Sequence, residues 1–395
     1  MHGSGEPVAA LADALASVIN QNVTAWRSAP AAATIERHVV RSIASALGCE
    51  NFVGSFCGGG SMANLMALAM AREALLPANE SGAQAGVTYA SSEAHMSVPK
   101  AIALLGLGRV NLRSVAVDAN YRMNVDALRA QIAADLAGGR RPLAVVATAG
   151  TVNTGAIDPL RSIAAVCREF GLWLHVDGAY GALAALAVPE RFGGLAEADS
   201  VSLDPHKWLY QPLDCGMLLY KDAAAARRAF SFSGDYAKSL ATDSLESFAF
   251  FDESLELSRR FRALKLWLSV RYHGLGAFRA AIRADLEHAR QLAAAIAASD
   301  ALELMAPHEL SAVCFRHRAA AQRNCNELNA AILQRVIDRG RVYFSNATLN
   351  GQFVLRACFV NHRTTAADVA QIVPEVLEAG REVLQSRQQT SASKS

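Results

Sequence analysis

The chain has 395 residues, of which 52% are hydrophobic, and its formal net charge is +2. A chain of this length can bury a large core and is expected to form more than one domain. Its basic residues are scattered and form no long run. Neither nucleic acid nor an anionic membrane surface is therefore expected as a partner.

The seven cysteines are spread along the chain, without C-x-x-C pairs or zinc-ligand spacing. We therefore expect neither a disulfide framework nor a metal site. Residues 1–7 are polar and do not lead into an apolar signal sequence. No apolar run approaches the roughly 20 residues that cross a bilayer. The sequence thus predicts a cytoplasmic protein without a membrane partner.

Apolar residues at helical spacing predict two helices at the start of the chain, over 8–20 and 34–47. A glycine-rich segment, 54–61, then precedes a helix over 62–76. Strands and helices alternate after it. The predicted strands are 86–90, 109–117, 143–148, 172–176, 200–203 and 216–220. The predicted helices are 98–105, 124–136 and one that Asp158 caps, with Pro159 at its first position.

This alternation predicts βαβ units and a mostly parallel sheet, whose chemistry lies at the carboxyl ends of the strands. A polar loop over 231–247 is long enough to form a mobile lid, and a helix over 258–272 follows. The pattern then changes to helix, strand, helix, strand, helix. The predicted parts are an N-terminal helical segment (1–50), a large cofactor-binding domain (51–277), a small C-terminal domain (278–386) and a disordered tail (387–395).

An acid and a lysine each follow an apolar strand, since Asp177 comes after 172–176 and Lys207 comes shortly after 200–203. Three glycines, 58–60, precede Ser61 at the start of a predicted helix. Glycines at a helix N-terminus suit a phosphate group. An amine can form an imine with an aldehyde, and a carboxylate can keep a pyridine nitrogen protonated. The three features together suit a phosphorylated pyridine cofactor.

Each feature has an ordinary structural explanation when it is taken alone. Many glycine-rich segments are only turns, an aspartate after a strand often caps a turn, and a strand-end lysine usually reaches solvent. Lysine is rare here, however, with six residues against 32 arginines. The conjunction of all three features in one βαβ region favours a cofactor site.

Four segments resemble the group II pyridoxal-dependent decarboxylases, which include the aromatic-L-amino-acid, tyrosine, tryptophan, histidine and glutamate decarboxylases. These segments are D-P-H-K-W-L at 204–209, H-V-D-G-A-Y at 175–180, T-A-G-T-V-N-T-G-A-I-D at 148–158 and S-R-R-F-R-A-L-K-L-W at 258–267. The resemblance covers nearly the whole chain in the family's order. It implies an α/β fold of the fold-type I, aspartate aminotransferase-like class: a mostly parallel seven-stranded sheet flanked by helices, with a smaller α+β C-terminal domain.

The resemblance also implies pyridoxal 5′-phosphate (PLP) as the cofactor and assigns catalytic roles to four residues. Lys207 is the Schiff-base lysine, Asp177 pairs with the pyridinium nitrogen, and His95 stacks on the ring. Tyr236, in the polar loop, returns a proton after carbon dioxide leaves; related aldehyde synthases tend to carry phenylalanine there. The implied cofactor-binding residues are Gly60, Ser61, His95, Thr151, Asp177, Ala179, Asp204, His206 and Lys207.

The resemblance leaves two roles open for Arg356, which either helps to hold the substrate carboxylate or forms a structural ion pair. The implied reaction is the decarboxylation of an L-amino acid, and Trp208 favours an aromatic one. The resemblance further implies a homodimer whose active sites lie at the interface. It begins well inside the family's sequences, so the family's usual N-terminal segment has no counterpart here.

Other functions stay open at this point. An oxygen-dependent aldehyde synthase and an aminotransferase would share the fold. An inactive paralogue acting as an interaction subunit is a third alternative, suggested by the unmatched N-terminal segment. A nicotinamide-dependent dehydrogenase is disfavoured because the glycines lack G-x-G-x-x-G spacing followed by a ribose-binding acid.

Overall fold

The computed structural model describes residues 3–82, 84–232, 247–318 and 325–392. Two compact units make up the chain. The larger unit contains Ser4–Thr151 and Ile157–Arg279, and the smaller unit contains Met1–Gly3, Val152–Ala156 and Ala280–Ser395. Within the described ranges, no helix combines the length and the hydropathy that a bilayer span requires.

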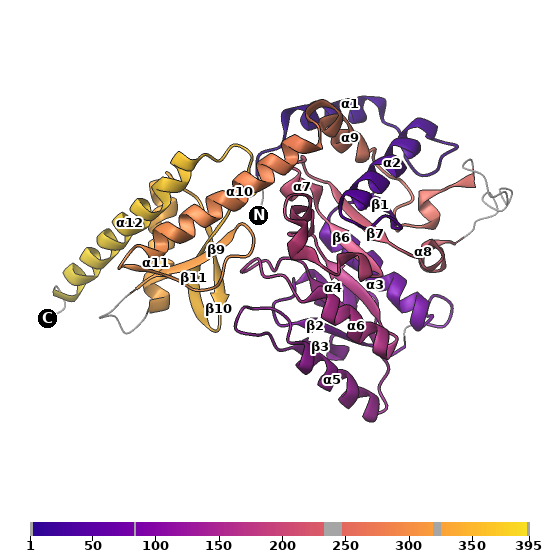
Figure 1. The fold of residues 1–395 in the computed structure, drawn as a ribbon, viewed down its shortest axis with the longest axis horizontal. Coiled ribbons are helices and arrows are strands. Elements are labelled where there is room, and N and C mark those ends of the chain that lie inside the picture. Colours follow the sequence, from indigo (N-terminus) through magenta and orange to yellow (C-terminus); the bar gives the residue numbers. More distant parts are fainter. Residues whose placement is uncertain (1–2, 83, 233–246, 319–324, 393–395) are drawn as a thin grey trace. The chain divides into compact units, whose positions relative to one another are not determined.

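The larger unit is built on a seven-stranded sheet with helices packed beside it (Figure 1). Its strands are β1 (Val53–Cys57), β2 (Val87–Ser91), β3 (Leu112–Val115), β4 (Pro142–Thr148), β5 (Trp173–Asp177), β6 (Ser200–Leu203) and β7 (Gly216–Tyr220). Its helices are α1 (Pro7–Ile19), α2 (Pro30–Ala46), α3 (Gly60–Leu75), α4 (Ser97–Leu104), α5 (Val125–Ala137), α6 (Leu160–Phe170), α7 (Pro205–Trp208), α8 (Ala223–Phe230) and α9 (Ala263–His273).

The strand order is β1-β7-β6-β5-β4-β2-β3, and only β7 runs antiparallel to its neighbours. The predicted mostly parallel sheet is therefore confirmed. β1 was not predicted, because its glycine-containing sequence was assigned to the turn that follows. Gly54 is required there, since a Cβ at this position would lie 2.0 Å from the carbonyl oxygen of Leu218 in β7.

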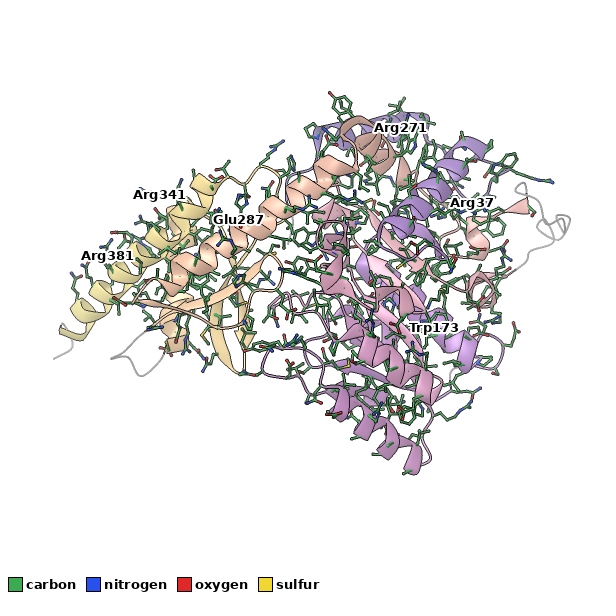
Figure 2. All side chains as sticks on the ribbon, in the orientation of Figure 1. Arg37, Trp173, Arg271, Glu287, Arg341 and Arg381 are labelled. Atoms are coloured by element: carbon green, nitrogen blue, oxygen red, sulfur yellow. The ribbon has the colours of Figure 1, made fainter. Side chains whose placement is uncertain are left out.

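The core of the larger unit is formed by apolar side chains from the sheet and from α3, α4 and α8. Residues 143–148 of β4 are all buried, which explains why this strand reads as a continuous apolar run rather than an alternating one. Trp173, at the start of β5, is likewise buried in this unit, whereas charged side chains such as Arg381 extend outward from the smaller unit (Figure 2).

One predicted helix cap is wrong. Helix α6 begins at Leu160, and its first turn receives no side-chain cap. The carboxylate of Asp158 instead accepts hydrogen bonds from the backbone N–H groups of Met123 and Thr148, both at 2.7 Å. Asp158 thus ties the end of β4 to the segment before α5, because these buried donors need a hydrogen-bond partner.

The smaller unit contains a four-stranded antiparallel sheet in the order β10-β11-β9-β8. Its elements are α10 (Leu275–Ala297, which begins in the larger unit), β8 (Leu302–Leu304), β9 (Ala312–His317), α11 (Cys325–Arg339), β10 (Ser345–Leu349), β11 (Gln352–Cys358) and α12 (Ala366–Ala392). The sequence predicted two strands in this region rather than four. It also predicted a disordered tail from residue 387, where α12 continues to Ala392.

Candidate active site

Asp177 and Lys207 lie at the carboxyl ends of two neighbouring strands. Asp177 is the last residue of β5, and Lys207 lies in the short helix α7 that follows β6. The two strands are parallel, and their register places Asp177 opposite Ser202. The Ser202 hydroxyl donates a hydrogen bond of 3.2 Å to Asp177 Oδ1. The acid and the lysine are therefore presented at the same edge of the sheet.

The amine of Lys207 forms an ion pair with a buried carboxylate. Lys207 Nζ lies 2.9 Å from Asp204 Oδ2, and His206 Nε2 lies 3.4 Å from the same oxygen. His206 Nδ1 is 2.8 Å from the carbonyl oxygen of Cys215 and donates to it, which fixes the ring orientation. The other oxygen of Asp204, Oδ1, is buried without a hydrogen-bond partner among the described residues. A buried carboxylate oxygen in that condition favours the approach of a donor from a ligand or from water.

A glycine allows the N-terminus of α3 to approach both strand ends. A Cβ at Gly60 would lie 2.6 Å from Ala179 Cβ and 3.1 Å from Asp204 Oδ2, so a larger residue would collide with the segments after β5 and β6. Gly59 precedes the helix with φ of 130°, a conformation that favours glycine. Ser61 is exposed in the first turn. The free N–H groups of this turn can bind an anion such as a phosphate.

The carboxylate of Asp177 is held by donors on both of its oxygens. Asn64 Nδ2 donates to Oδ2 at 2.9 Å, while the Ala179 backbone N–H and the Ser202 hydroxyl donate to Oδ1, both at 3.2 Å. Only 5% of Asp177 is exposed. The carboxylate therefore has a fixed direction before any ligand binds, as a group that pairs with a ring nitrogen requires.

His95 is half-buried in the turn before α4. Its Nδ1 lies 2.8 Å from the Ser97 hydroxyl and accepts a hydrogen bond of 3.2 Å from the Ser97 backbone N–H. Ser97 in turn contacts Asn64 at 2.9 Å, so the hydrogen-bond network that holds Asp177 extends to this imidazole.

Three predicted site residues remain: Thr151, Tyr236 and Arg356. Thr151 is fully buried at the end of the segment that follows β4. Tyr236 lies outside the described residues. Arg356 belongs to the smaller unit, where its guanidinium donates to the carbonyl oxygen of Val152 and, at 3.2 Å, to the Ser345 hydroxyl.

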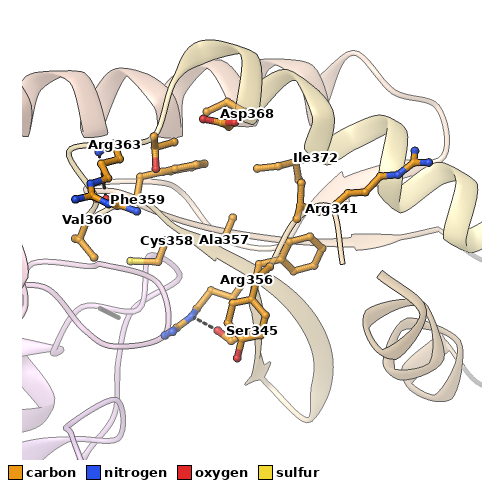
Figure 3. A pocket seen from close by; sticks show the side chains of 16 residues that line it. Arg341, Ser345, Arg356, Ala357, Cys358, Phe359, Val360, Arg363, Asp368 and Ile372 are labelled. Carbon is orange, nitrogen blue, oxygen red and sulfur yellow. Dashed lines mark hydrogen bonds between the residues drawn. The ribbon is translucent and has the colours of Figure 1, made fainter. Parts of the chain in front are cut away.

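Arg356 also lines a cavity of about 540 Å³ within the smaller unit. Figure 3 shows its side chain directed toward Ser345, with Arg341 and Arg363 on opposite sides of the view. Arg341 is paired with Glu375. The contacts of Arg356 with Val152 and Ser345 both lie within this unit.

His175 lies two residues before Asp177 in β5, and burial keeps its imidazole neutral. The side chain is fully buried in β5, and burial lowers the pKa of its imidazole to about 4, against an opposing effect of the nearby Asp177. Its Nδ1 lies 2.9 Å from the Ser200 hydroxyl, and its Nε2 lies 2.9 Å from Asn64 Oδ1. Trp173 Nε1 donates to the same Ser200 oxygen at 2.9 Å.

This arrangement predicts a pH dependence of stability. The folded-state pKa of His175 is below the unfolded value near 6.5, so the unfolded chain binds more protons between pH 6.5 and 4, and stability falls as the pH falls through this window. The wild type should lose about 2 kcal/mol more than His175→Gln between pH 7.5 and pH 5. Denaturant titrations at both pH values measure this difference. Parallel pH profiles for the two proteins would contradict it.

Two residues of this network were missed from the sequence. Asn64 interrupts the otherwise apolar run between Met62 and Met70 in α3, and Ser97 begins α4. A buried-type helix with one polar residue near its start gives a signal, because buried amides need specific partners. The identity of those partners depends on the sheet order and could not be read from the chain.

The described residues fit a phosphorylated pyridine aldehyde. A glycine-lined helix N-terminus, an amine beside a buried carboxylate and a second, firmly held carboxylate all lie around the ends of β5 and β6. Lys207 would carry the aldehyde carbon, Asp177 would meet the ring nitrogen, and the first turn of α3 would bind the phosphate.

Comparisons with known proteins agree with this geometry. Residues 2–318 match the family model described as the pyridoxal-dependent decarboxylase conserved domain. An aromatic-L-amino-acid decarboxylase of Bacillus atrophaeus is 36% identical over 387 residues, covering 96% of this chain and 80% of the relative. A phenylacetaldehyde synthase of Petunia hybrida is 31% identical over 368 residues, covering 88% and 72%.

Solved structures give the same answer for the fold. The crystal structure of Oryza sativa TDC with PLP and tryptamine superimposes with a TM-score of 0.90 at 29% identity, covering 96% of this chain and 82% of that one. This similarity confirms the predicted fold class, and the family model confirms PLP as the cofactor. The chain therefore belongs to the pyridoxal-dependent decarboxylase family.

Proposed function

We propose that this protein removes the carboxylate of an aromatic L-amino acid, using PLP, and releases the corresponding amine and carbon dioxide. The observation that carries the proposal is the placement of Lys207 and Asp177 after adjacent parallel strands, with Gly60 against both strand ends. The aromatic substrate class is supported by the Bacillus relative, which is an aromatic-L-amino-acid decarboxylase.

We propose a role for each predicted site residue of the larger unit. Lys207 is the attachment point of the cofactor, and its pairing with Asp204 orients the amine before the aldehyde arrives. When bound, the cofactor supplies an electron sink for the pair of electrons left on Cα as carbon dioxide departs. Asp177 stabilises the protonated ring nitrogen on which that sink depends, and Ala179 packs under the ring. His95 covers the opposite ring face.

The phosphate end and the substrate end are also proposals. Gly60 and Ser61 bind the phosphate, with Asp204 and His206 nearby, and Thr151 also contacts the cofactor. Tyr236 delivers the proton that replaces the carboxylate on Cα. For Arg356, contact with the substrate carboxylate remains the second of two roles beside its structural one. The bonds balance: the Cα–carboxylate bond breaks, a Cα–H bond forms, and one proton is consumed.

Product analysis tests the proposal. The protein is incubated with PLP and each of L-tryptophan, L-tyrosine, L-phenylalanine and L-glutamate, and the amine and carbon dioxide are quantified. We expect equal amounts of amine and carbon dioxide from an aromatic substrate and little from L-glutamate. Carbon dioxide production from L-glutamate alone would contradict the substrate class, and no release from any of them would contradict the reaction.

A second candidate is an aldehyde synthase, which the similarity to the Petunia phenylacetaldehyde synthase brings into consideration. That reaction consumes oxygen and yields aldehyde, ammonia and hydrogen peroxide besides carbon dioxide. The presence of a tyrosine at position 236 favours amine formation. Hydrogen peroxide in amounts matching carbon dioxide would decide for the aldehyde synthase.

We also propose that the protein acts as a homodimer. Helix α1 packs on α9 through small residues, with Ala9, Ala12 and Ala16 buried. Its opposite side exposes Leu11 by 73% and Val18 by 82%, an apolar surface suited to a second copy. The molar mass in solution, measured by light scattering, tests this proposal. For location we propose the cytoplasm, since several buried thiols, including Cys57 and Cys215, suit a reducing compartment.

A further inference from the structure

We propose that Asn64 is a positioning residue that joins the carboxylate of Asp177 to the imidazole of His95 and fixes the orientation of both. This inference rests on the proposed function, because it assigns an origin to the geometry of two groups that contact the cofactor. It concerns one buried side chain in the second turn of α3, with 1% of the residue exposed.

The amide of Asn64 uses its full donor capacity inside this network. One hydrogen of Nδ2 goes to Asp177 Oδ2, and the other goes to the Ser97 hydroxyl oxygen, both at 2.9 Å. Its carbonyl oxygen lies 2.9 Å from His175 Nε2. A side chain with two donors and an acceptor on one planar group is needed to meet these three partners at once.

The orientation of this amide is set by its contacts with β5. The carboxylate of Asp177 accepts hydrogen bonds, so the NH₂ group of Asn64 faces it and Oδ1 faces His175 Nε2. The neutral imidazole therefore carries its proton on Nε2, and its Nδ1 accepts from the Ser200 hydroxyl. A flipped amide would place its NH₂ group against this N–H and its oxygen against the carboxylate of Asp177. Two repulsive contacts in a buried site would therefore oppose the flip.

The opposite end of the network sets the tautomer of His95. The Ser97 oxygen accepts from Asn64, which leaves the Ser97 hydroxyl hydrogen for His95 Nδ1. The Ser97 backbone N–H also donates to this nitrogen. With two donors directed at Nδ1, neutral His95 carries its proton on Nε2. The imidazole therefore presents an N–H rather than a lone pair on the side away from Ser97.

The consequence is that Asp177 and His95 are not independent. Both depend on one amide, so a change at Asn64 releases the carboxylate that meets the ring nitrogen and the imidazole proposed to cover the ring face. Replacing Ser97 by alanine removes the hydroxyl contact with the imidazole and leaves the bond between Asn64 and Asp177 in place. This difference between the two positions distinguishes a positioning network from general packing.

The experiment compares Asn64→Leu, which keeps a similar volume without hydrogen bonds, with Ser97→Ala. The dissociation constant of PLP is measured by titration, and the ring ¹⁵N shifts of the histidines are recorded in the cofactor-free protein. For Asn64→Leu we expect PLP binding to weaken by roughly 10- to 100-fold, since a hydrogen bond to a charged group is lost. Both variants should shift His95 from the Nε2–H form toward a mixture of tautomers, while PLP binding by Ser97→Ala changes less.

Asn329→Leu serves as the matched control. Asn329 is a fully buried asparagine of the smaller unit, and its amide is hydrogen-bonded to the backbone of His317. Its replacement should lower the melting temperature but leave PLP binding and the His95 shifts unchanged. An Asn64→Leu protein with wild-type PLP affinity and an unchanged His95 tautomer would overturn the inference.

The two proposals fail in distinguishable ways. If the wild type binds no PLP, the proposed function fails, while the ¹⁵N shifts in the cofactor-free protein still report on the network. If the wild type binds PLP and forms amine but the Asn64 and Ser97 variants behave as it does, only the positioning role is rejected. Should Asn64→Leu not fold, Ser97→Ala tests the network instead. A change in the His95 tautomer supports the positioning role, and an unchanged tautomer rejects it.

Discussion

Lys207→Ala is expected to reduce decarboxylation by at least about 10³-fold, because it removes the amine to which the cofactor is proposed to attach. Lys207 is the lysine placed beyond β6, beside Asp204 and at the strand edge that carries Asp177. The variant should also lack the visible absorption band that PLP acquires when it is attached to a lysine. Turnover and the absorption spectrum with added PLP measure the two effects.

Lys100→Ala is the control, since Lys100 is an exposed lysine on α4. Its spectrum and rate should match those of the wild type. A Lys207→Ala protein that kept a normal band and a normal rate would end the assignment of this residue. Loss of the rate with a normal band would mean that the amine contributes to proton transfer but not to attachment.

Glu36→Ala is expected to destabilise the larger unit by about 3 to 5 kcal/mol, because it leaves a buried guanidinium without its counter-charge. Glu36 and Arg259 have fully buried side chains and form an ion pair between α2 and the segment before α9. Arg259 also donates to the carbonyl oxygens of Val23 and Phe56 and lies 4.1 Å from the ring centroid of Phe250. The free energy of unfolding from denaturant titration measures the effect.

Glu169→Ala is the matched control for this prediction. Glu169 pairs with Arg129 at the surface, where both side chains are nearly half exposed, and such pairs contribute about 1 kcal/mol or less. A loss of unfolding free energy in Glu36→Ala no larger than that in Glu169→Ala would show that the buried pair is dispensable.

Because Glu36 also accepts from the Phe56 backbone N–H, Glu36→Ala should additionally loosen β1 and weaken PLP binding.

The centre of the parallel sheet was predictable because β2, β4, β5 and β6 are buried on both faces. The bounds of β6 and β7 match the predicted residues, β4 begins one residue earlier than predicted, and β5 is shifted by one residue. Long apolar runs of β-branched and aliphatic residues, bounded by glycine and polar residues, specify such strands locally. The sheet order and the antiparallel direction of β7 are not local properties, and the resemblance rather than the pattern predicted the seven-stranded arrangement.

The elements that were missed depend on distant partners. β1 contains Gly54, and glycine is not typical of strands. It is required here because the backbone of β7 passes so close that a Cβ would collide with it. In the smaller unit, β10 is an edge strand in which three of the five residues are not buried, so its sequence carries little apolar signal. The start of α9 was placed too early, since Arg259 and Arg262 precede the helix and are held by ion pairs.

The candidate site divides in the same way. Lys207 and Asp177 follow strands and are recognisable from the pattern, whereas Asn64 and Ser97 contribute only through partners that the fold brings to them. The roles proposed for Tyr236 and for Arg356 at the substrate stay predictions. A hydrogen-bond network formed between α3, α4 and two strands joins residues that are far apart in the chain, so no sequence pattern predicts it.

The pairing of β1 with β7 has a consequence for the order of events during synthesis. β1 lies at the sheet edge, with β7 as its neighbouring strand, and it leads directly into the turn at Gly60. A ribosome-bound chain that ended soon after Lys207 would already contain the glycine turn, the acid and the amine. It would lack the strand against which β1 aligns. The nascent protein should therefore acquire its affinity for PLP only after residues 216–220 have left the exit tunnel.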